Sequence, residues 1–188
     1  MLGYIVPTIG RETLAETLAS IPDDCLSDVL VVCDDPLRAE WVIPLVEESG
    51  PKFHVCVNPD GPTGNPGHTI LHRYAGCLNA AYICYLGDDD VAMPGALEMA
   101  NKIIESMPYP PAVVIANTLY GDRAIPGDEE PRYGILDATS IVVRKDILLS
   151  HPWPDTPAGT PADWAYHQQL RKSGVPMHRS KAVIARKL

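Results

Sequence analysis

The sequence lacks any apolar run long enough to cross a membrane, which takes about 20 residues, so we expect no transmembrane helix. It also lacks a CxxC pair, and its five cysteines are an odd number spread mostly through apolar stretches. We interpret them as small buried residues of a reducing compartment, not as a disulfide framework or a zinc site. The N-terminus has neither the charged segment nor the cleavage site of a signal peptide, so the predicted location is cytoplasmic.

Positive charge is scarce as well. There are 15 Lys and Arg residues against 24 Asp and Glu residues, giving a net charge of −9. Binding to nucleic acid or to anionic membranes depends on clustered cations, so the composition disfavours both as general functions. A hydrophobic content of 46% over 188 residues excludes disorder and predicts one folded domain.

Short apolar runs alternate with amphipathic stretches along the first two thirds of the chain. Strands are expected over residues 2–6, 29–33, 53–57, 82–86 and 112–117, with helices over 8–21, 37–48, 69–81 and 94–107. The second part is less regular, with a strand over 138–143, short helices over 145–149 and 161–173, and a last strand within 176–188. Loops are expected over 58–67, 118–133 and 151–161. This order predicts a single α/β domain over 1–188, with a mostly parallel sheet flanked by helices.

Polar residues follow three of the expected strands. Thr8 follows the first, Asp34 and Asp35 the second, and Asp88–Asp90 the fourth. In α/β sheets, ligands bind at the carboxyl ends of the strands, so these residues mark a candidate site. Three adjacent carboxylates repel one another unless a cation joins them, and Mg²⁺ or Mn²⁺ takes such ligands together with substrate phosphates. The alternative is an acidic loop that caps the next helix.

Four segments also stand in a familiar order: YIVPTIGR at 4–11, VVCDD at 31–35, the stretch 73–97 that contains YLGDDD, and ADW at 162–164. Together they resemble the GT-A glycosyltransferases of the family-2 type. Ile9-Gly10 departs from the usual Tyr-Asn of that family, which puts an aromatic contact to the nucleobase in doubt. The resemblance covers most of the chain and is best over residues 1–100.

The resemblance implies a metal-dependent, inverting glycosyltransferase with a nucleotide-diphosphate sugar (UDP- or GDP-sugar) as donor and Mn²⁺ or Mg²⁺ as cofactor. Residues 1–100 would bind the donor, and 101–188 would bind the acceptor and supply the catalytic base, Asp163. The substrate-binding residues would be Pro7, Thr8, Arg11, Asp34, Asp35, Arg73, Asp88 and Asp89. The metal ligands would be Asp90, Asp89 and His178.

Each of these residues also has a structural explanation. Asp34, Asp35 and Asp163 are frequent helix N-caps. Arg73 could be a solvated helical arginine, and His178 a surface histidine. Trp153, in a proline-rich stretch, is a further predicted substrate-binding residue, expected to stack on a sugar ring, and its structural alternative is a core tryptophan.

His68 and His72 are four residues apart on an expected helix, which allows a two-ligand zinc face or, in preference, the rim of the donor site. Two other activities remain open. One is a sugar-nucleotide-binding domain without turnover. The other is a sugar-nucleotide nucleotidyltransferase, disfavoured because the loop after the first strand is not glycine-rich. A phosphatase of the haloacid-dehalogenase type is disfavoured because Asp88–Asp90 follow the fourth strand and not the first. The acceptor stays unspecified: a saccharide, a lipid-linked sugar, a protein or a modified nucleobase.

Overall fold

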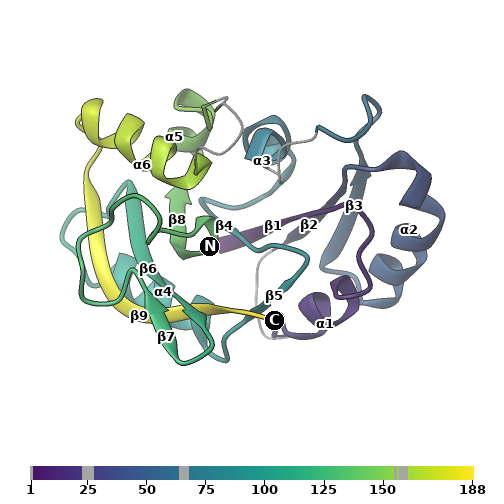
Figure 1. The fold of residues 1–188 in the computed structure, drawn as a ribbon, viewed down its shortest axis with the longest axis horizontal. Coiled ribbons are helices and arrows are strands. Elements are labelled where there is room, and N and C mark those ends of the chain that lie inside the picture. Colours follow the sequence, from purple (N-terminus) through teal and green to yellow (C-terminus); the bar gives the residue numbers. More distant parts are fainter. Residues whose placement is uncertain (1, 23–27, 64–67, 155, 157–160) are drawn as a thin grey trace.

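The computed structural model describes residues 2–22, 28–63, 68–154, 156 and 161–188. Within these ranges nine strands form one sheet in the order β3-β2-β1-β4-β8-β6-β9-β5, with β7 also paired to β6 (Figure 1). The strands are β1 (Leu2–Thr8), β2 (Val29–Cys33), β3 (Phe53–Val57), β4 (Tyr82–Tyr85), β5 (Asp90–Ala92), β6 (Val113–Tyr120), β7 (Arg123–Ile125), β8 (Ile141–Arg144) and β9 (Met177–Lys187).

Helices cover both faces of this sheet. They are α1 (Leu14–Ala19), α2 (Ala39–Glu48), α3 (His68–Tyr74), α4 (Ala96–Glu105), α5 (Lys145–Ser150) and α6 (Ala162–Lys172), with short 3₁₀ turns η1 (Pro36–Arg38), η2 (Ala75–Cys77) and η3 (Ala138–Ser140). Apolar residues of α1, α2 and α4 pack into one core, and those of α3, α5 and α6 into a second. Successive strand residues alternate between the two: Val31 contributes to the first core and Val32 to the second. The predicted α/β domain with helices on both faces is therefore confirmed.

The sheet is mixed, with fewer parallel pairings than the sequence predicts. β1 pairs in parallel with β2 and β4, and β2 with β3, as expected from the alternation of strands and helices. β8 then inserts between β4 and β6 and is antiparallel to both. β9 is parallel to β6 and antiparallel to β5. The periodicity of a strand does not report its neighbours, so the insertion of β8 was not visible in the sequence.

Two local boundaries also differ from the expectation. Helix α1 begins at Leu14, not at Thr8, because the chain first turns at Gly10, whose φ of 79° lies in the left-handed region. The expected loop over 118–133 contains the end of β6 and its hairpin partner β7. Parts of the expected loops over 58–67 and 151–161 lie outside the described residues, as does Cys25.

The described part of the chain contains four of the five cysteines, Cys33, Cys56, Cys77 and Cys84. Cys33 and Cys84 are buried as predicted, whereas Cys77 is exposed and so does not have the expected core position. No helix in the described ranges is long and apolar enough to span a membrane.

Candidate active site

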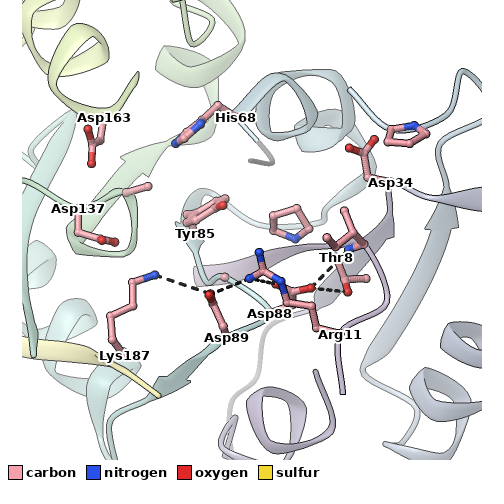
Figure 2. A pocket seen from close by; sticks show the side chains of 15 residues that line it. Thr8, Arg11, Asp34, His68, Tyr85, Asp88, Asp89, Asp137, Asp163 and Lys187 are labelled. Carbon is pink, nitrogen blue, oxygen red and sulfur yellow. Dashed lines mark hydrogen bonds and ion pairs between the residues drawn. The ribbon is translucent and has the colours of Figure 1, made fainter. Parts of the chain in front are cut away.

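A pocket of about 520 Å³ opens at the carboxyl ends of β1, β2 and β4. Its lining residues come from distant parts of the chain, as Figure 2 shows. They are Pro7, Thr8, Ile9, Arg11, Asp34, Pro62, His68, Tyr85, Gly87, Asp88, Asp89, Asp137, Ala138, Asp163 and Lys187. Seven of the predicted site residues are among them: Pro7, Thr8, Arg11, Asp34, Asp88, Asp89 and Asp163.

Thr8 and Arg11 hold the acidic loop against the end of β1. The Thr8 hydroxyl donates to Asp88 Oδ2 at 2.7 Å, and Arg11 Nη1 donates to Asp88 Oδ1 at 3.1 Å and to Asp89 Oδ2 at 2.7 Å. Burial raises the pKa of Asp88, while Thr8 and Arg11 act in the opposite direction by favouring the charged form. Half of the Arg11 side chain stays exposed, so its guanidinium can also face a ligand.

Asp34 lies buried at the end of β2, where three donors fix its carboxylate. Asn58 Nδ2 donates to Oδ1 at 2.7 Å, and the backbone N–H and hydroxyl of Thr63 donate to Oδ2, each at 2.9 Å. An ionised carboxylate offers about four acceptor positions, so about one remains for an N–H group entering the pocket.

Asp35 and Arg73 do not line this pocket. Asp35 caps η1 by accepting from the Leu37 backbone N–H at 3.0 Å, which is the structural alternative that the sequence allowed. Arg73 Nη1 donates to Asn58 Oδ1 at 3.1 Å and to Asp60 Oδ2 at 2.9 Å. Since Asn58 donates to Asp34, Arg73 acts on the site through Asn58, and its predicted contact with a nucleotide stays a prediction.

Gly87 lets the acidic loop turn tightly before β5. A Cβ at this position would lie 2.5 Å from Asp90 Oδ2 and 2.9 Å from Asp89 Oδ1, so a larger residue would displace both carboxylates. The Gly87 N–H itself donates to Asp90 Oδ2 at 3.1 Å.

Asp90 is fully buried and is not among the residues that line the pocket. Its Oδ2 accepts from Lys187 Nζ at 2.9 Å, while Oδ1 has no partner within the described residues. Burial raises the pKa of Asp90 to about 6, although the Lys187 ammonium opposes that shift.

The predicted metal ligands are not brought together as a set. His178 lies at the beginning of β9, whereas Lys187, at the end of that strand, stands beside Asp90 and lies 3.8 Å from Asp89 Oδ1. Among the residues described, no group of three His, Cys, Asp or Glu side chains could hold a metal ion. Asp88, Asp89 and Asp90 instead share two resident cations, Arg11 and Lys187, so the arrangement does not fit the predicted ligand set of Asp89, Asp90 and His178.

Asp163 lies in the first turn of α6, at the end of the pocket opposite Asp34 (Figure 2). Its Oδ1 accepts from the Trp164 backbone N–H at 2.7 Å, while its side chain lines the pocket. Burial raises its pKa to about 6, and the nearby Asp137 carboxylate adds to this effect. A carboxylate with such a pKa can accept a proton near neutral pH.

Asp137 was not predicted as a site residue. It caps η3, accepting from the Thr139 N–H at 2.9 Å, and it also accepts from the Tyr120 hydroxyl. The only local signal was an Asx turn before an apolar strand, a common structural motif. Its position in the pocket depends on the insertion of β8 next to β4, which no local pattern reports.

His68 lines the pocket and His72 does not, so the predicted place of this pair at the rim of a donor site stays a prediction. Burial lowers the pKa of His68 to about 4, so the ring is neutral at physiological pH. Trp153, by contrast, is only 5% exposed and does not line the pocket. Its ring stacks on Tyr166 with centroids 4.3 Å apart and on His68 at 4.8 Å. The expectation that its face is open to a sugar is therefore wrong: Trp153 is a core residue that supports His68.

No family model and no curated protein matches the sequence. Solved structures do match the fold. The Staphylococcus aureus TarS fragment 1–349 superposes with a TM-score of 0.73 at 13% identity, over 99% of this chain and 60% of that one. The same fragment in complex with UDP-GlcNAc superposes with a TM-score of 0.73 at 14% identity, over 98% of this chain and 57% of that one. In complex with UDP it superposes with a TM-score of 0.69 at 14% identity, over 98% of this chain and 59% of that one.

TarS is a glycosyltransferase of the GT-A type. The present chain spans about 60% of the length of that TarS fragment, and at 13% identity the similarity concerns the fold. The mixed sheet and its flanking helices agree with this architecture. The chain therefore has the α/β fold of the GT-A glycosyltransferases.

Proposed function

We propose that this chain transfers a sugar from a nucleotide-diphosphate sugar, a UDP-sugar in the first place, to an acceptor hydroxyl with inversion at the anomeric carbon. One observation carries the proposal: Asp163, whose pKa burial raises to about 6, lines one end of the pocket, and Thr8 and Asp34, after β1 and β2, line the other. The fold match to TarS structures that contain UDP-GlcNAc and UDP supports this choice of donor.

The donor end is assigned from its residue types. Pro7, Ile9 and Pro62 form apolar walls on which a nucleobase can rest. The remaining acceptor position of Asp34 suits a base N–H, such as N3–H of uracil or N1–H of guanine. Arg11, beside Asp88 and Asp89, is within the same pocket and can contact ribose or phosphate oxygens.

Asp163 would act as the general base of a single displacement. Its carboxylate takes the proton of the acceptor hydroxyl while that oxygen forms a bond to the anomeric carbon. The bond from this carbon to the β-phosphate oxygen breaks, and its electron pair leaves with the nucleoside diphosphate. Attack opposite the leaving group gives inversion. These steps name only groups of the chain itself, and the Mn²⁺ or Mg²⁺ cofactor implied by the resemblance stays a prediction.

The test is release of UDP from UDP-GlcNAc, and of GDP from a GDP-sugar, in the presence of a panel of saccharide acceptors. Asp163→Asn should reduce turnover by about 10²-fold or more while UDP binding changes little, because general-base catalysis contributes about that factor. Asp146→Asn, an exposed residue paired with Arg144, is the matched control and should keep full activity.

The pH profile gives a second readout. Asp163 must be ionised to accept a proton, so turnover should fall as the pH is lowered through about 6. Near-normal turnover in Asp163→Asn would contradict the assignment of the base. Binding of UDP with no turnover in the wild-type chain would favour the binding domain without catalysis, and release of pyrophosphate would favour the nucleotidyltransferase.

A further inference from the structure

We propose that Lys187 supplies the positive charge that holds the β-phosphate of the donor, in the place where the sequence predicts a divalent cation. The inference rests on the proposed function, because it assigns a role within that donor site. It begins from a difference between prediction and structure: the predicted metal ligands Asp89 and Asp90 lie beside Lys187, not beside His178.

The sheet places Lys187 there by register. Asp90 in β5 and Lys187 in β9 are direct partners of an antiparallel pair, so their side chains lie on the same face. One residue further along, the Leu188 N–H donates to the Asp89 carbonyl at 3.1 Å, which ties the end of β9 to the acidic loop. Backbone pairing before and after Lys187 thus holds this residue opposite Asp90, within reach of the Asp90 carboxylate.

The fully buried Asp90 anchors this ammonium without competing for the pocket. Asp90 Oδ2 accepts from Nζ at 2.9 Å but does not line the pocket, whereas the Lys187 side chain does and is 27% exposed. Nζ lies 2.9 Å from Asp90 Oδ2 and 3.8 Å from Asp89 Oδ1, and two such carboxylates favour the charged ammonium. An ammonium has three donors, and one bond to Asp90 leaves two for a ligand.

The charge balance of the pocket gives such a cation its function. Five carboxylates and only two cationic side chains, Arg11 and Lys187, are among the described lining residues. A diphosphate that enters this acidic pocket needs a cation at its β-phosphate, because negative charge increases there as the sugar leaves. In Figure 2, Arg11 lies toward Thr8, whereas Lys187 lies nearer the side of Asp163, where the reacting sugar carbon would be.

The experiment is calorimetric titration of UDP and UMP into the wild-type chain and Lys187→Met, each with EDTA and with Mn²⁺. We expect the wild type to bind UDP in EDTA. Lys187→Met should weaken UDP binding in EDTA by about tenfold or more, because a charged hydrogen bond is lost, and UMP binding by less than about threefold. Lys187→Arg should keep most of the affinity, and Mn²⁺ should restore part of it in Lys187→Met by occupying the freed carboxylates.

Two controls keep the result interpretable. Lys181→Met removes an exposed lysine paired with Asp128 and should change neither ligand's affinity. Asp90→Asn combined with Lys187→Met avoids an unpaired buried carboxylate if the single variant fails to fold, and it should show the same selective loss of UDP affinity.

The outcomes separate the two proposals. Wild-type binding of UDP that requires Mn²⁺, together with unchanged affinity in Lys187→Met, would overturn the role of Lys187 and leave the glycosyltransferase proposal standing. Equal losses of affinity for UDP and UMP in Lys187→Met would also overturn it, since the lysine would then not contact the β-phosphate. If neither UDP nor UMP binds under any condition, the proposed function itself fails.

Discussion

The hydroxyl of Thr8 donates a 2.7 Å hydrogen bond to Oδ2 of Asp88, which is 80 residues away in the sequence. This bond joins the end of β1 to the acidic loop after β4. Both side chains are buried, and Arg11 completes the contact from the pocket side. The pocket is thus built on two adjacent parallel strands, and its geometry depends on groups that also stabilise the fold.

Thr8→Val should therefore cost both stability and ligand affinity. Loss of a hydrogen bond to a buried carboxylate destabilises by about 1–3 kcal/mol, and release of Asp88 should weaken UDP binding. Thr17→Val is a matched control, because Thr17 is equally buried but its hydroxyl has no partner among the described residues. It should leave stability unchanged or raise it. Urea denaturation and calorimetry measure the two effects, and similar losses in both variants would contradict this account.

Gly87→Ala should disrupt the acidic loop. The added Cβ meets the carboxylates of Asp89 and Asp90, so we expect a loss of about 1–3 kcal/mol in stability and a clear loss of UDP affinity. Gly76→Ala is the control, since a Cβ there meets nothing within 4 Å. It should be neutral or stabilise by up to about 1 kcal/mol through the unfolded state. A Gly87→Ala chain with wild-type affinity would show that the loop rearranges freely.

Asp163→Asn should stabilise the folded chain at neutral pH. The folded-state pKa of about 6 exceeds the ordinary value of 3.8, so the group favours folding below pH 3.8 and loses that contribution as the pH rises through 6. Removing the charge should add about 1–2 kcal/mol at pH 7.5, less than the full shift because the side chain is partly exposed, and nothing near pH 3.

The opposite sign is expected for Asp146→Asn. The hydrogen bond from Arg144 lowers the pKa of Asp146, so its contribution to stability is present above pH 3.8 and is lost as the pH falls further. Asp146→Asn should thus lose a little stability at pH 7.5, whereas Asp163→Asn gains it. Denaturation midpoints measured from pH 3 to pH 8 compare the two variants. If the midpoint of Asp163→Asn differs from that of the wild type by the same amount at every pH, the raised pKa is refuted.

Trp153→Ala should lower stability more than it lowers ligand affinity. The indole is buried against Tyr166 and His68, and truncation of such a residue costs about 3–5 kcal/mol. Trp41→Ala, at a 41% exposed position on α2, should cost about 1 kcal/mol or less. The measurement is chemical denaturation followed by titration of UDP at a temperature where each variant is folded. A stable Trp153→Ala chain with lost sugar binding would restore the stacking role.

The first half of the fold follows from local patterns. Apolar runs and the turns between them predicted β1 to β4. Thr8, Asp34 and Asp88 follow three of these strands and line one pocket, as expected from their positions at the strand ends. The second half depends on pairings between distant strands. Asp137 and Lys187 enter the pocket only because β8 inserts beside β4 and β9 pairs with β5, and neither pairing has a signature in the chain itself.

The type of a residue also does not decide its role where the role depends on burial, which the sequence does not show. Trp153 and Asp90 carry the right chemistry for a sugar contact and a metal ligand, yet both are buried and neither lines the pocket. Asp163 was predicted from the resemblance of residues 162–164 to a family motif, and it lies in the pocket lining at the beginning of α6. Its role as a base stays a prediction.

The central claim is that the pocket at the ends of β1, β2 and β4 binds a nucleoside diphosphate. Calorimetric titration of UDP and GDP into the wild-type chain, beside Asp34→Ala and Arg11→Ala, tests it most directly. We expect binding of one nucleotide at a 1:1 ratio, with clear loss of affinity in both variants. Absence of binding for both nucleotides, or affinity that neither substitution changes, would contradict the account and leave the glycosyltransferase similarity as one of fold alone.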